Sequence, residues 1–279
     1  MPELPEVETV RRTLEELVIG KTIEDITIHW PKIIKAPEEP DVFIDALKGQ
    51  TISAVCRRGK FLLFYLDDYA LVSHLRMEGK YGLYPGEESY DKHTHVLFLF
   101  TDGSQLRYRD VRKFGTMHLY KKGEEFNSPP LKNLGPEPLS PDFTPVYLGQ
   151  RLARTQRKIK PVLLDQNVVV GIGNIYVDEA LFRAGIHPER TASGLRPDEI
   201  SRLHKEITET LAEAIEKGGS TIRTYVNSQG KIGSFQLDLN VYGRKGENCK
   251  ACSTPLMKLT VGGRGTHICP SCQPAETAP

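Results

Sequence analysis

Pro2 and Glu3, near the start of the chain, have the residue types and the spacing that covalent catalysis by an amine requires. Proline is small enough for the initiator Met1 to be removed, which would leave Pro2 with a free secondary amine. An α-amino group has a reference pKa near ~8, below the ~10.4 of lysine, so a useful fraction is nucleophilic at neutral pH. Such an amine can form an iminium with a sugar C1′, and Glu3 is a candidate general acid/base beside it. The alternative is an ordinary acidic helix start that contains proline.

Four of the five cysteines form two Cys-x-x-Cys pairs, Cys249 with Cys252 and Cys269 with Cys272, separated by sixteen residues. Each pair lets two thiolates reach one ion from a tight turn, and two pairs on a hairpin complete a tetrahedral site. Because protein ligands would fill all four positions, the spacing predicts one structural Zn²⁺. Because the segment that holds these pairs is too short to bury a core, we expect metal binding to stabilise its fold. The alternative is four unligated thiols.

The segment Gly171-Ile-Gly173-Asn174 has the beginning of a dinucleotide-binding loop. The third glycine of that motif would fall at position 176, which is Tyr, and no βαβ pattern surrounds it, so this interpretation is discarded. A tight turn into a helix explains the segment better, with Asn174 near the N-cap, where exposed amides bind a phosphate. His187, which follows that helix, is expected to be packed in a turn and not catalytic.

The elements that must position these residues change in type along the chain. A helix is predicted over 5–18, with Gly20 as its stop, and its dipole would favour the carboxylate of Glu3 and disfavour an ammonium at Pro2. Between residues 22 and 120, short β-branched and aromatic runs are typical of an all-β sandwich or barrel. The expected strands are 22–30, 51–57, 60–66, 70–76, 95–101, 105–109 and 116–120, with a further helix at about 40–48. Cys56, in the second strand, is expected to be buried.

Five prolines within residues 127–144 mark a linker, and the pattern beyond it is helical. Helices are expected at 147–154, 161–165, 174–184 and 197–216. The net charge of the chain is only +1, but residues 151–160 carry five cations and no acid. No run of ~18 apolar residues and no charged-then-apolar leader is found, so neither a membrane span nor a signal peptide is supported.

The opening PELPEVETVRR resembles the N-terminal signature of the formamidopyrimidine-DNA glycosylases, bacterial base-excision enzymes that remove oxidised purines and nick the backbone. The Gly171–Asn174 segment and the zinc hairpin also resemble that family, so the likeness covers nearly the whole chain. It implies that Pro2 and Glu3 are catalytic. It also implies that Lys60 binds a phosphate and shuttles a proton, and that Arg264, at the hairpin tip, grips phosphates and assists the second elimination. For Lys60 the alternative is a solvated lysine at a strand end.

Met77, Arg112 and Phe114 are side chains of the kind that can refill the hole left when an enzyme extrudes a base. In the family these three positions form that wedge, and the arginine hydrogen-bonds to the orphaned base. The alternative is that Met77 and Phe114 are core residues. The further DNA-binding candidates are the family-matched His74, His93 and Asn174, and, from the basic run alone, Arg154 and Lys158.

We therefore expect an α+β protein, with an N-terminal β-sandwich flanked by helices and a C-terminal helix–two-turn–helix domain that carries a four-cysteine zinc hairpin. The expected boundaries are a catalytic domain at 1–128, a linker at 129–144, a DNA-binding domain at 145–240 with a lesion-capping loop at about 220–239, a zinc finger at 241–273 and a disordered tail at 274–279. Within the loop, Thr221 to Tyr225 are expected nearest the extruded base.

The expected function is that of a bacterial, cytoplasmic and monomeric glycosylase and abasic-site lyase, acting through a Schiff base on Pro2. Its partner would be double-stranded DNA that contains oxidised purines or abasic sites, with no membrane partner. One alternative is an endonuclease VIII-like enzyme for oxidised pyrimidines, in which glycine is typical at the position of Leu4. The other is a non-catalytic zinc-ribbon DNA-binding protein, which would have no use for a trimmed N-terminal amine.

Overall fold

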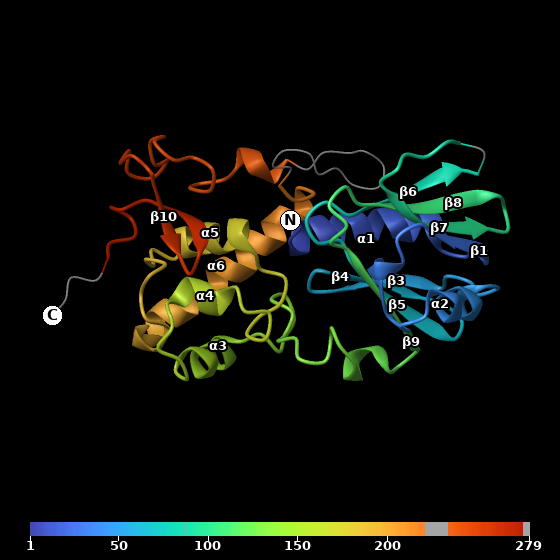
Figure 1. Ribbon diagram of the computed structural model, residues 1–279. Helices are drawn as coiled ribbons and strands as arrows, with labels where there is room; N and C mark the ends of the chain where they lie inside the picture. Colours follow the sequence, from blue (N-terminus) through green and yellow to red (C-terminus); the bar gives the residue numbers. More distant parts are fainter. Residues whose placement is uncertain (87, 221–233, 276–279) are drawn as a thin grey trace. The chain divides into compact units, whose positions relative to one another are not determined.

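The structure, a computed structural model, describes residues 1–86, 88–220 and 234–275 (Figure 1). Contacts divide the chain into two compact units. Unit 1 comprises residues 1–133 and the segment that begins at Gly218, and unit 2 comprises residues 134–217 and those from Ser234 onward. The first boundary thus falls within the proline-rich segment expected to be a linker. None of the described helices is both long enough and apolar enough to cross a membrane.

Unit 1 contains two β-sheets and two α-helices. One sheet has the strand order β1-β7-β8-β6 and the other β2-β9-β5-β4-β3, and all neighbours are antiparallel except the parallel pair β2–β9. The elements are α1 Leu4–Val18, β1 Ile23–Ile28, β2 Ile34–Ala36, α2 Pro40–Leu47, β3 Ala54–Arg58, β4 Phe61–Tyr65, β5 Tyr69–His74, β6 Lys80–Pro85, β7 Thr94–Phe100, β8 Ser104–Arg109 and β9 Thr116–Lys121, with 3-10 turns at Pro31–Ile33 and Glu125–Asn127.

Both sheets and α1 bury their apolar side chains in one core, which confirms the expected β-sandwich. Helix α1 contributes Val7, Val10, Leu14 and Val18, the face that its sequence predicts. All seven expected strands are present. Two more were not predicted: β2 has only three residues, and β6 is interrupted by Gly82 and ends at a proline, so neither shows a clear strand pattern.

The expectation that Cys56 is buried is wrong. Its side chain is exposed, because residues of a strand alternate between the two faces of a sheet and Val55 takes the buried position on β3. Cysteine type alone could not reveal which face of the strand it occupies.

Unit 2 is helical and ends in a β-hairpin. Its elements are α3 Pro145–Leu152, α4 Ile159–Leu163, α5 Asn174–Arg183, α6 Pro197–Glu216, 3-10 turns at Ala192–Gly194 and Phe235–Leu237, and strands β10 Met257–Val261 and β11 Arg264–Ile268. Helices α5 and α6 pack on a core of their own, with Tyr176, Leu203 and Phe235 fully buried. The four expected helices are confirmed. Helices α3 and α4 each begin and end two residues earlier than expected, and the N-cap of α5 is Gly173, with Asn174 as its first helical residue.

Candidate functional site

Pro2 and Glu3 lie directly before α1, and both are buried. Glu3 is the N-cap residue of this helix, and its backbone N–H donates a hydrogen bond to Glu6 Oε2 (2.8 Å). The pair therefore occupies the positive end of a fifteen-residue helix dipole. The dipole stabilises a carboxylate at position 3 and disfavours a protonated amine at position 2, as the sequence predicts.

Glu6 connects this helix start to a distant part of the chain within unit 1. Its Oε1 accepts hydrogen bonds from the backbone N–H (2.7 Å) and the hydroxyl (3.2 Å) of Ser220. Gly219 has a φ of +79°, and a Cβ at this position would lie 2.7 Å from the same oxygen. The buried carboxylate thus requires a glycine next to it and fixes the last residues before position 221. The expected lesion-capping residues Thr221 to Tyr225 lie outside the described residues.

Lys60 lies in the two-residue turn that joins β3 to β4, and it is buried. The turn is possible because Gly59 adopts a φ of +57°. Arg57 supports it: one nitrogen donates to the Gly59 carbonyl (3.0 Å) and another to Glu8 (3.1 Å). Burial acts to raise the pKa of Glu8, but hydrogen bonds and charges from Arg11 and Arg57 outweigh burial and hold that pKa below its usual value. Lys60 is not the solvated strand-end lysine of the alternative interpretation.

His74, the last residue of β5, is a buried neutral ring. Its Nδ1 accepts a hydrogen bond from the backbone N–H of Arg76 (2.8 Å), and Phe61 packs edge-on against it with centroids 4.5 Å apart. Burial, followed by the positive charges of Arg76 and Lys60, lowers the pKa of His74 to about 3. At neutral pH, His74 can therefore offer DNA a hydrogen bond but no positive charge.

The expected wedge residues are exposed, so the alternative that Met77 and Phe114 are core residues is wrong. Met77 is 39 % exposed and Phe114 is 50 % exposed. The Arg112 guanidinium lies over the Phe114 ring, 4.8 Å from its centroid. Met77 and Phe114 each follow a residue in the left-handed region, Arg76 (φ +54°) and Lys113 (φ +58°). Non-glycine residues adopt this conformation at a cost, and such strain gathers at functional sites.

His93 lies just before β7 and is joined to the loop that carries Arg112. Its carbonyl accepts the backbone N–H of Asp110 (2.9 Å), and its own N–H donates to Asp91 Oδ1 (2.9 Å). Unit 1 therefore holds eight of the predicted residues, at the start of α1 and in the loops and strand ends of the sandwich: Pro2, Glu3, Lys60, His74, Met77, His93, Arg112 and Phe114.

In unit 2, Asn174 and Arg264 are brought together through the hairpin. Arg264 is exposed at the start of β11, after the turn Gly262-Gly263, whose φ angles are +56° and +74°. Asn174 Nδ2 donates to the Gly265 carbonyl (2.9 Å). The first residue of α5 is therefore bonded to the residue next to Arg264.

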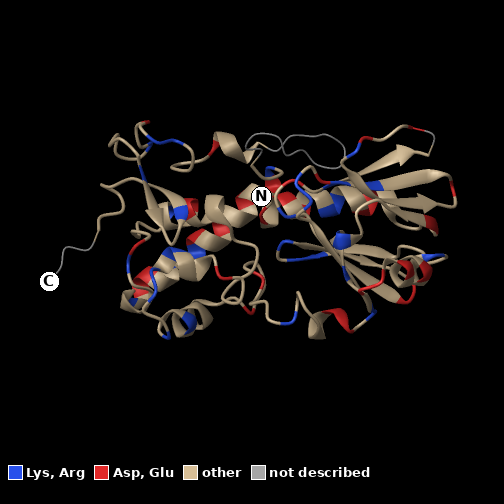
Figure 2. Ribbon diagram, viewed as in Figure 1, with Lys and Arg blue, Asp and Glu red and all other residues tan. Residues whose placement is uncertain are grey.

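The expected basic surface at 151–160 is smaller than its sequence suggests. Lys160 is 0 % exposed, and its Nζ donates to Asp178 Oδ1 and to Thr266 Oγ1, both at 2.7 Å. Lys160 is thus a buried link between α4, α5 and the hairpin. Lys158 is exposed and forms an ion pair with Glu189, and Arg154 is exposed just after α3. Figure 2 shows that lysine, arginine and acidic positions are spread over both units.

Three acids that organise these sites were not singled out from the sequence: Glu6, Asp110 and Asp178. Glu6 lies in the N-terminal signature and Asp110 lies two residues before Arg112. An acid inside a segment already assigned to the site could have been singled out as a residue that supports it. Asp178 is eighteen residues from Lys160, and no local pattern links the two. His187 is buried, and its Nδ1 accepts from the backbone of Glu189 (3.2 Å), as expected for a residue packed in a turn.

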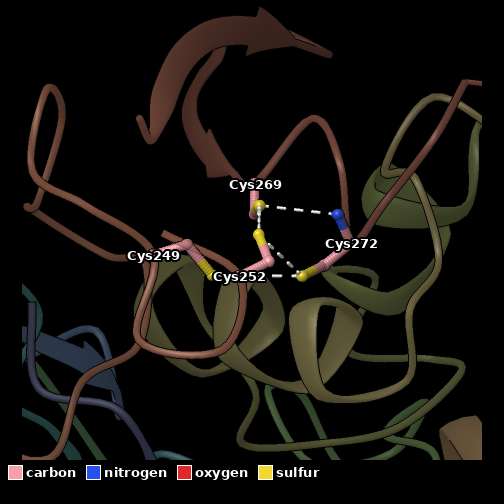
Figure 3. Close-up of side chains that lie close together, drawn as sticks. All are labelled: Cys249, Cys252, Cys269 and Cys272. Atoms are coloured by element: carbon pink, nitrogen blue, oxygen red, sulfur yellow. Dashed lines mark hydrogen bonds between the residues drawn. The ribbon is translucent and has the colours of Figure 1, made fainter. Parts of the chain in front are cut away.

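The four cysteines of the C-terminal hairpin region face one point (Figure 3). All four sulfurs lie within 4.8 Å of one another, and three pairs are 3.4, 3.5 and 3.9 Å apart. Tetrahedral zinc with ~2.3 Å bonds to sulfur places its ligands about 3.8 Å apart, so the arrangement fits one ion. The backbone N–H groups of Ala251 and Cys272 also donate to Cys249 and Cys269 sulfurs, which suits thiolate ligands.

Comparison with known proteins gives the same result for sequence and structure. Three family models match: the formamidopyrimidine-DNA glycosylase N-terminal domain at residues 1–117, the H2TH domain of the same family at 134–226, and the zinc finger found in FPG and IleRS at 246–275. A formamidopyrimidine-DNA glycosylase of Bacillus licheniformis is 66 % identical, covering 98 % of this chain and 99 % of that protein. This chain belongs to the formamidopyrimidine-DNA glycosylase family.

Other relatives agree with this family membership. The formamidopyrimidine-DNA glycosylase of Bacillus subtilis is 64 % identical over 98 % of this chain and 99 % of its own length. A Lactococcus lactis Fpg variant in complex with DNA that contains Fapy-dG superposes with a TM-score of 0.93 at 44 % identity, covering 98 % of this chain and all of the other. The Lactococcus lactis Fpg bound to DNA with an abasic site gives a TM-score of 0.92 at 45 % identity, with the same coverage.

The resemblance in the N-terminal signature, the α+β fold and the zinc prediction are thereby confirmed. The zinc-finger match covers all four cysteines, so Cys249, Cys252, Cys269 and Cys272 form the site of one zinc ion. Protein sulfurs take every ligand position, which leaves no place for a water or substrate. The role of the zinc is structural, and a non-catalytic zinc-ribbon protein is not supported.

Replacing Cys272 with Ser should release zinc and disorder the hairpin that presents Arg264. Binding to damaged and undamaged duplexes should weaken on the order of tenfold, with a smaller salt dependence, because a phosphate contact is lost. The measurements are zinc content by mass spectrometry and DNA affinity at several salt concentrations. Cys56→Ser is the matched control and should keep both zinc and affinity. A zinc-free Cys272→Ser protein that binds like the parent would contradict the assignment.

The lowered pKa of His74 predicts a specific pH dependence of stability. The folded-state pKa of about 3 lies below the ordinary 6.5, so the unfolded chain binds the proton more readily. Above pH 6.5 the ring is neutral in both states and protonation does not lower the free energy of unfolding. As the pH falls from 6.5 toward 3, only the unfolded chain takes up the proton, so the free energy of unfolding decreases. Between pH 6 and 4, the free energy of unfolding of the parent should fall by about 1.4 kcal/mol per pH unit more than that of His74→Asn. Asn is chosen because its side-chain oxygen can still accept the Arg76 N–H. Denaturant unfolding at a series of pH values measures this, and equal slopes would refute it.

Proposed function

We propose that this protein excises oxidised purines from duplex DNA and then cleaves the backbone, with the amine of Pro2 as the nucleophile. The observation that carries the proposal is the buried Pro2-Glu3 pair at the positive end of α1, in a member of the formamidopyrimidine-DNA glycosylase family. The proposal includes the removal of Met1, because only then is the Pro2 nitrogen a secondary amine. A DNA-binding protein without catalytic activity would have no need for this group.

The reaction needs no redox partner. The neutral Pro2 nitrogen attacks C1′, a C–N bond forms, and the bond from C1′ to the base breaks as the departing base takes up a proton. The Glu3 carboxylate then takes the N–H proton from the Pro2 nitrogen and passes it to O4′ as the C1′–O4′ bond opens, and the freed nitrogen lone pair forms an iminium with C1′. The iminium acidifies the C2′ proton, so loss of the 3′ phosphate by β-elimination and of the 5′ phosphate by δ-elimination follows. Water finally releases Pro2 by hydrolysis.

The other predicted residues would bind and shape the DNA. Lys60 is held by its turn as a phosphate-binding and proton-shuttling group, and Arg264 would grip phosphates and assist the second elimination. Met77, Arg112 and Phe114 would fill the space of the extruded base, for which their exposure suits them. His74, His93, Arg154, Lys158 and Asn174 would contact the DNA backbone. Zinc would act only by holding the hairpin.

The substrates we propose are 8-oxoguanine paired with cytosine, ring-opened formamidopyrimidines and abasic sites. Support comes from relatives named for formamidopyrimidine and from solved complexes of the Lactococcus lactis protein with Fapy-dG and abasic-site DNA. We further propose that the protein acts as a monomer on nucleoid DNA. We place it in the bacterial cytoplasm because the similar proteins come from bacteria, Bacillus licheniformis and Bacillus subtilis among them.

Borohydride added during incubation with an 8-oxoguanine duplex should trap a covalent protein–DNA adduct by reducing the iminium. Mass spectrometry of the digested adduct should find the nucleotide remnant on Pro2 and no Met1. Glu3→Gln should bind the lesion nearly as well as the parent but cut it at least about a hundredfold more slowly, because only the proton transfer is removed. A tag retained before Pro2 should abolish cutting and spare binding. Absence of any adduct from an active preparation would refute the covalent mechanism.

Single-turnover excision from matched duplexes tests the lesion preference. The parent should remove 8-oxoguanine opposite cytosine at least about tenfold faster than thymine glycol, because the fold and sequence follow the purine-specific family and not the endonuclease VIII type. Undamaged duplex of the same sequence is the control. Faster excision of thymine glycol would favour the endonuclease VIII-like alternative.

A further inference from the structure

A buried carboxylate lies beneath an exposed turn of unit 1. Residues 111–114 are all exposed, and the residue before them, Asp110, is 0 % exposed. Asp110 Oδ1 accepts the backbone N–H of Arg112 (2.9 Å), and Oδ2 accepts those of Phe114 (2.9 Å) and Gly115 (2.8 Å). Three backbone donors of one loop thus converge on a single side chain.

These hydrogen bonds act where the loop is strained. Lys113 has a φ of +58°, a conformation that its side chain disfavours and that an unsupported loop would leave. Bonds to an ionised acceptor are stronger than bonds between neutral groups. The bonds to Arg112 and Phe114 lie on either side of Lys113, so the carboxylate fixes the backbone across the strained residue. As a result, Arg112 and Phe114 point out together, with the guanidinium over the ring.

Asp110 is itself held rigidly by the sandwich. Its N–H donates to the His93 carbonyl (2.9 Å), and its carbonyl oxygen contacts Nε2 of the buried His95 (2.7 Å). The Tyr108 ring packs under the same loop: a Cβ at Gly115 would lie 1.7 Å from its hydroxyl oxygen, and one at Gly79 would lie 2.1 Å from it. The turn that carries Met77 and the loop that carries Phe114 therefore rest against one buried tyrosine.

We propose that Asp110 is a positioning residue that presets the Arg112–Phe114 loop for insertion into duplex DNA. Filling the space of an extruded base requires two side chains to enter the stack together, and a loop that had to be ordered at that moment would insert more slowly. Asp110 touches neither the reacting sugar nor the base in this scheme. Asp110 acts through the backbone of the loop. The effect of this role on catalysis rests on the proposed function.

This role differs from a general contribution to folding in one respect. Insertion matters only when the lesion is stacked and paired in a duplex. A single strand that contains an abasic site has no partner base and no stack to refill, so it requires the Pro2 chemistry but not the loop. Loss of the preset conformation should therefore slow the enzyme on duplexes selectively.

Asp110→Asn is the test variant, because it keeps the volume of the side chain but replaces one acceptor oxygen with an amide that cannot accept from these N–H groups. Glu125→Gln is the matched control. Glu125 is another buried acid of unit 1, and it accepts hydrogen bonds from the Gly123 N–H (2.7 Å) and the Tyr65 hydroxyl (2.9 Å). Both variants replace a buried carboxylate that accepts hydrogen bonds with an amide. Only Asp110→Asn does so beneath the Arg112–Phe114 loop.

The full chain is assayed under single-turnover conditions on an 8-oxoguanine duplex and on single-stranded DNA with an abasic site. Asp110→Asn should be at least about tenfold slower than the parent on the duplex and within about twofold of it on the single strand. Its preference for cytosine over adenine opposite the lesion should fall, because Arg112 would no longer be aimed at the orphaned base. Glu125→Gln should match the parent in all three measurements.

Hydrogen exchange of the free proteins gives a readout that does not depend on activity. The amides of Arg112, Phe114 and Gly115 should exchange faster in Asp110→Asn, with β7 and β8 unchanged, and should be unaffected in Glu125→Gln. A parent that cuts neither substrate would refute the proposed function itself. With an active parent, Asp110→Asn that cuts the duplex at the parent rate, loses both activities equally, or fails to fold would overturn the positioning role.

Discussion

The docking of α1 on the sandwich core is the constraint on which the rest of unit 1 depends. Four apolar side chains of this helix are buried among those of both sheets, which fixes the direction of its axis. The residues before its first turn then have a fixed place, although a chain terminus is ordinarily among the least ordered parts of a protein. The nucleophilic role proposed for Pro2 requires such a fixed place. The same docking places the helix dipole on Glu3, so one packing interaction sets both position and electrostatics.

Buried carboxylates that accept backbone N–H groups recur as the means of holding irregular segments. Glu6 accepts hydrogen bonds from Ser220 and from the start of α1, and Asp110 accepts them from the loop of residues 111–115. In unit 2, Glu179 is fully buried and accepts the N–H groups of three consecutive residues, Asn240, Val241 and Tyr242, at 2.8–2.9 Å. Irregular backbone has no ladder of its own, so its donors need another acceptor when buried. An ionised acceptor serves several at once and gives the segment one preferred conformation.

The sequence carried the parts of the fold that depend on local pattern. The apolar face of α1, seven strands and the Cys-x-x-Cys pairs follow from spacing within a few residues, and the structure has all of them. What it did not reveal depends on residues distant in the chain. The short strand β2 exists because β9 offers it a parallel neighbour, and nothing in Ile34–Ala36 alone indicates this. Lys160 was counted as a surface cation because its partners Asp178 and Thr266 lie eighteen and over a hundred residues away.

Lys160 and Asp178 form a buried ion pair in unit 2. A buried ion pair is weak evidence for stability, because desolvation of both ions offsets most of their attraction. Removing one partner is different, and costs about 3–5 kcal/mol, because the other charge remains buried and unpaired. The pair joins α4 to α5, and the hairpin docks on it through a neutral group, the Thr266 hydroxyl, which accepts from Lys160 Nζ (2.7 Å). Asp178 also accepts the His267 N–H (2.8 Å), so β11 is held at both its side chain and its backbone. The zinc site holds the end of the hairpin region, and the hydrogen bonds of Thr266 and His267 with this ion pair hold β11 on α5, so Arg264 has a defined place at the hairpin tip.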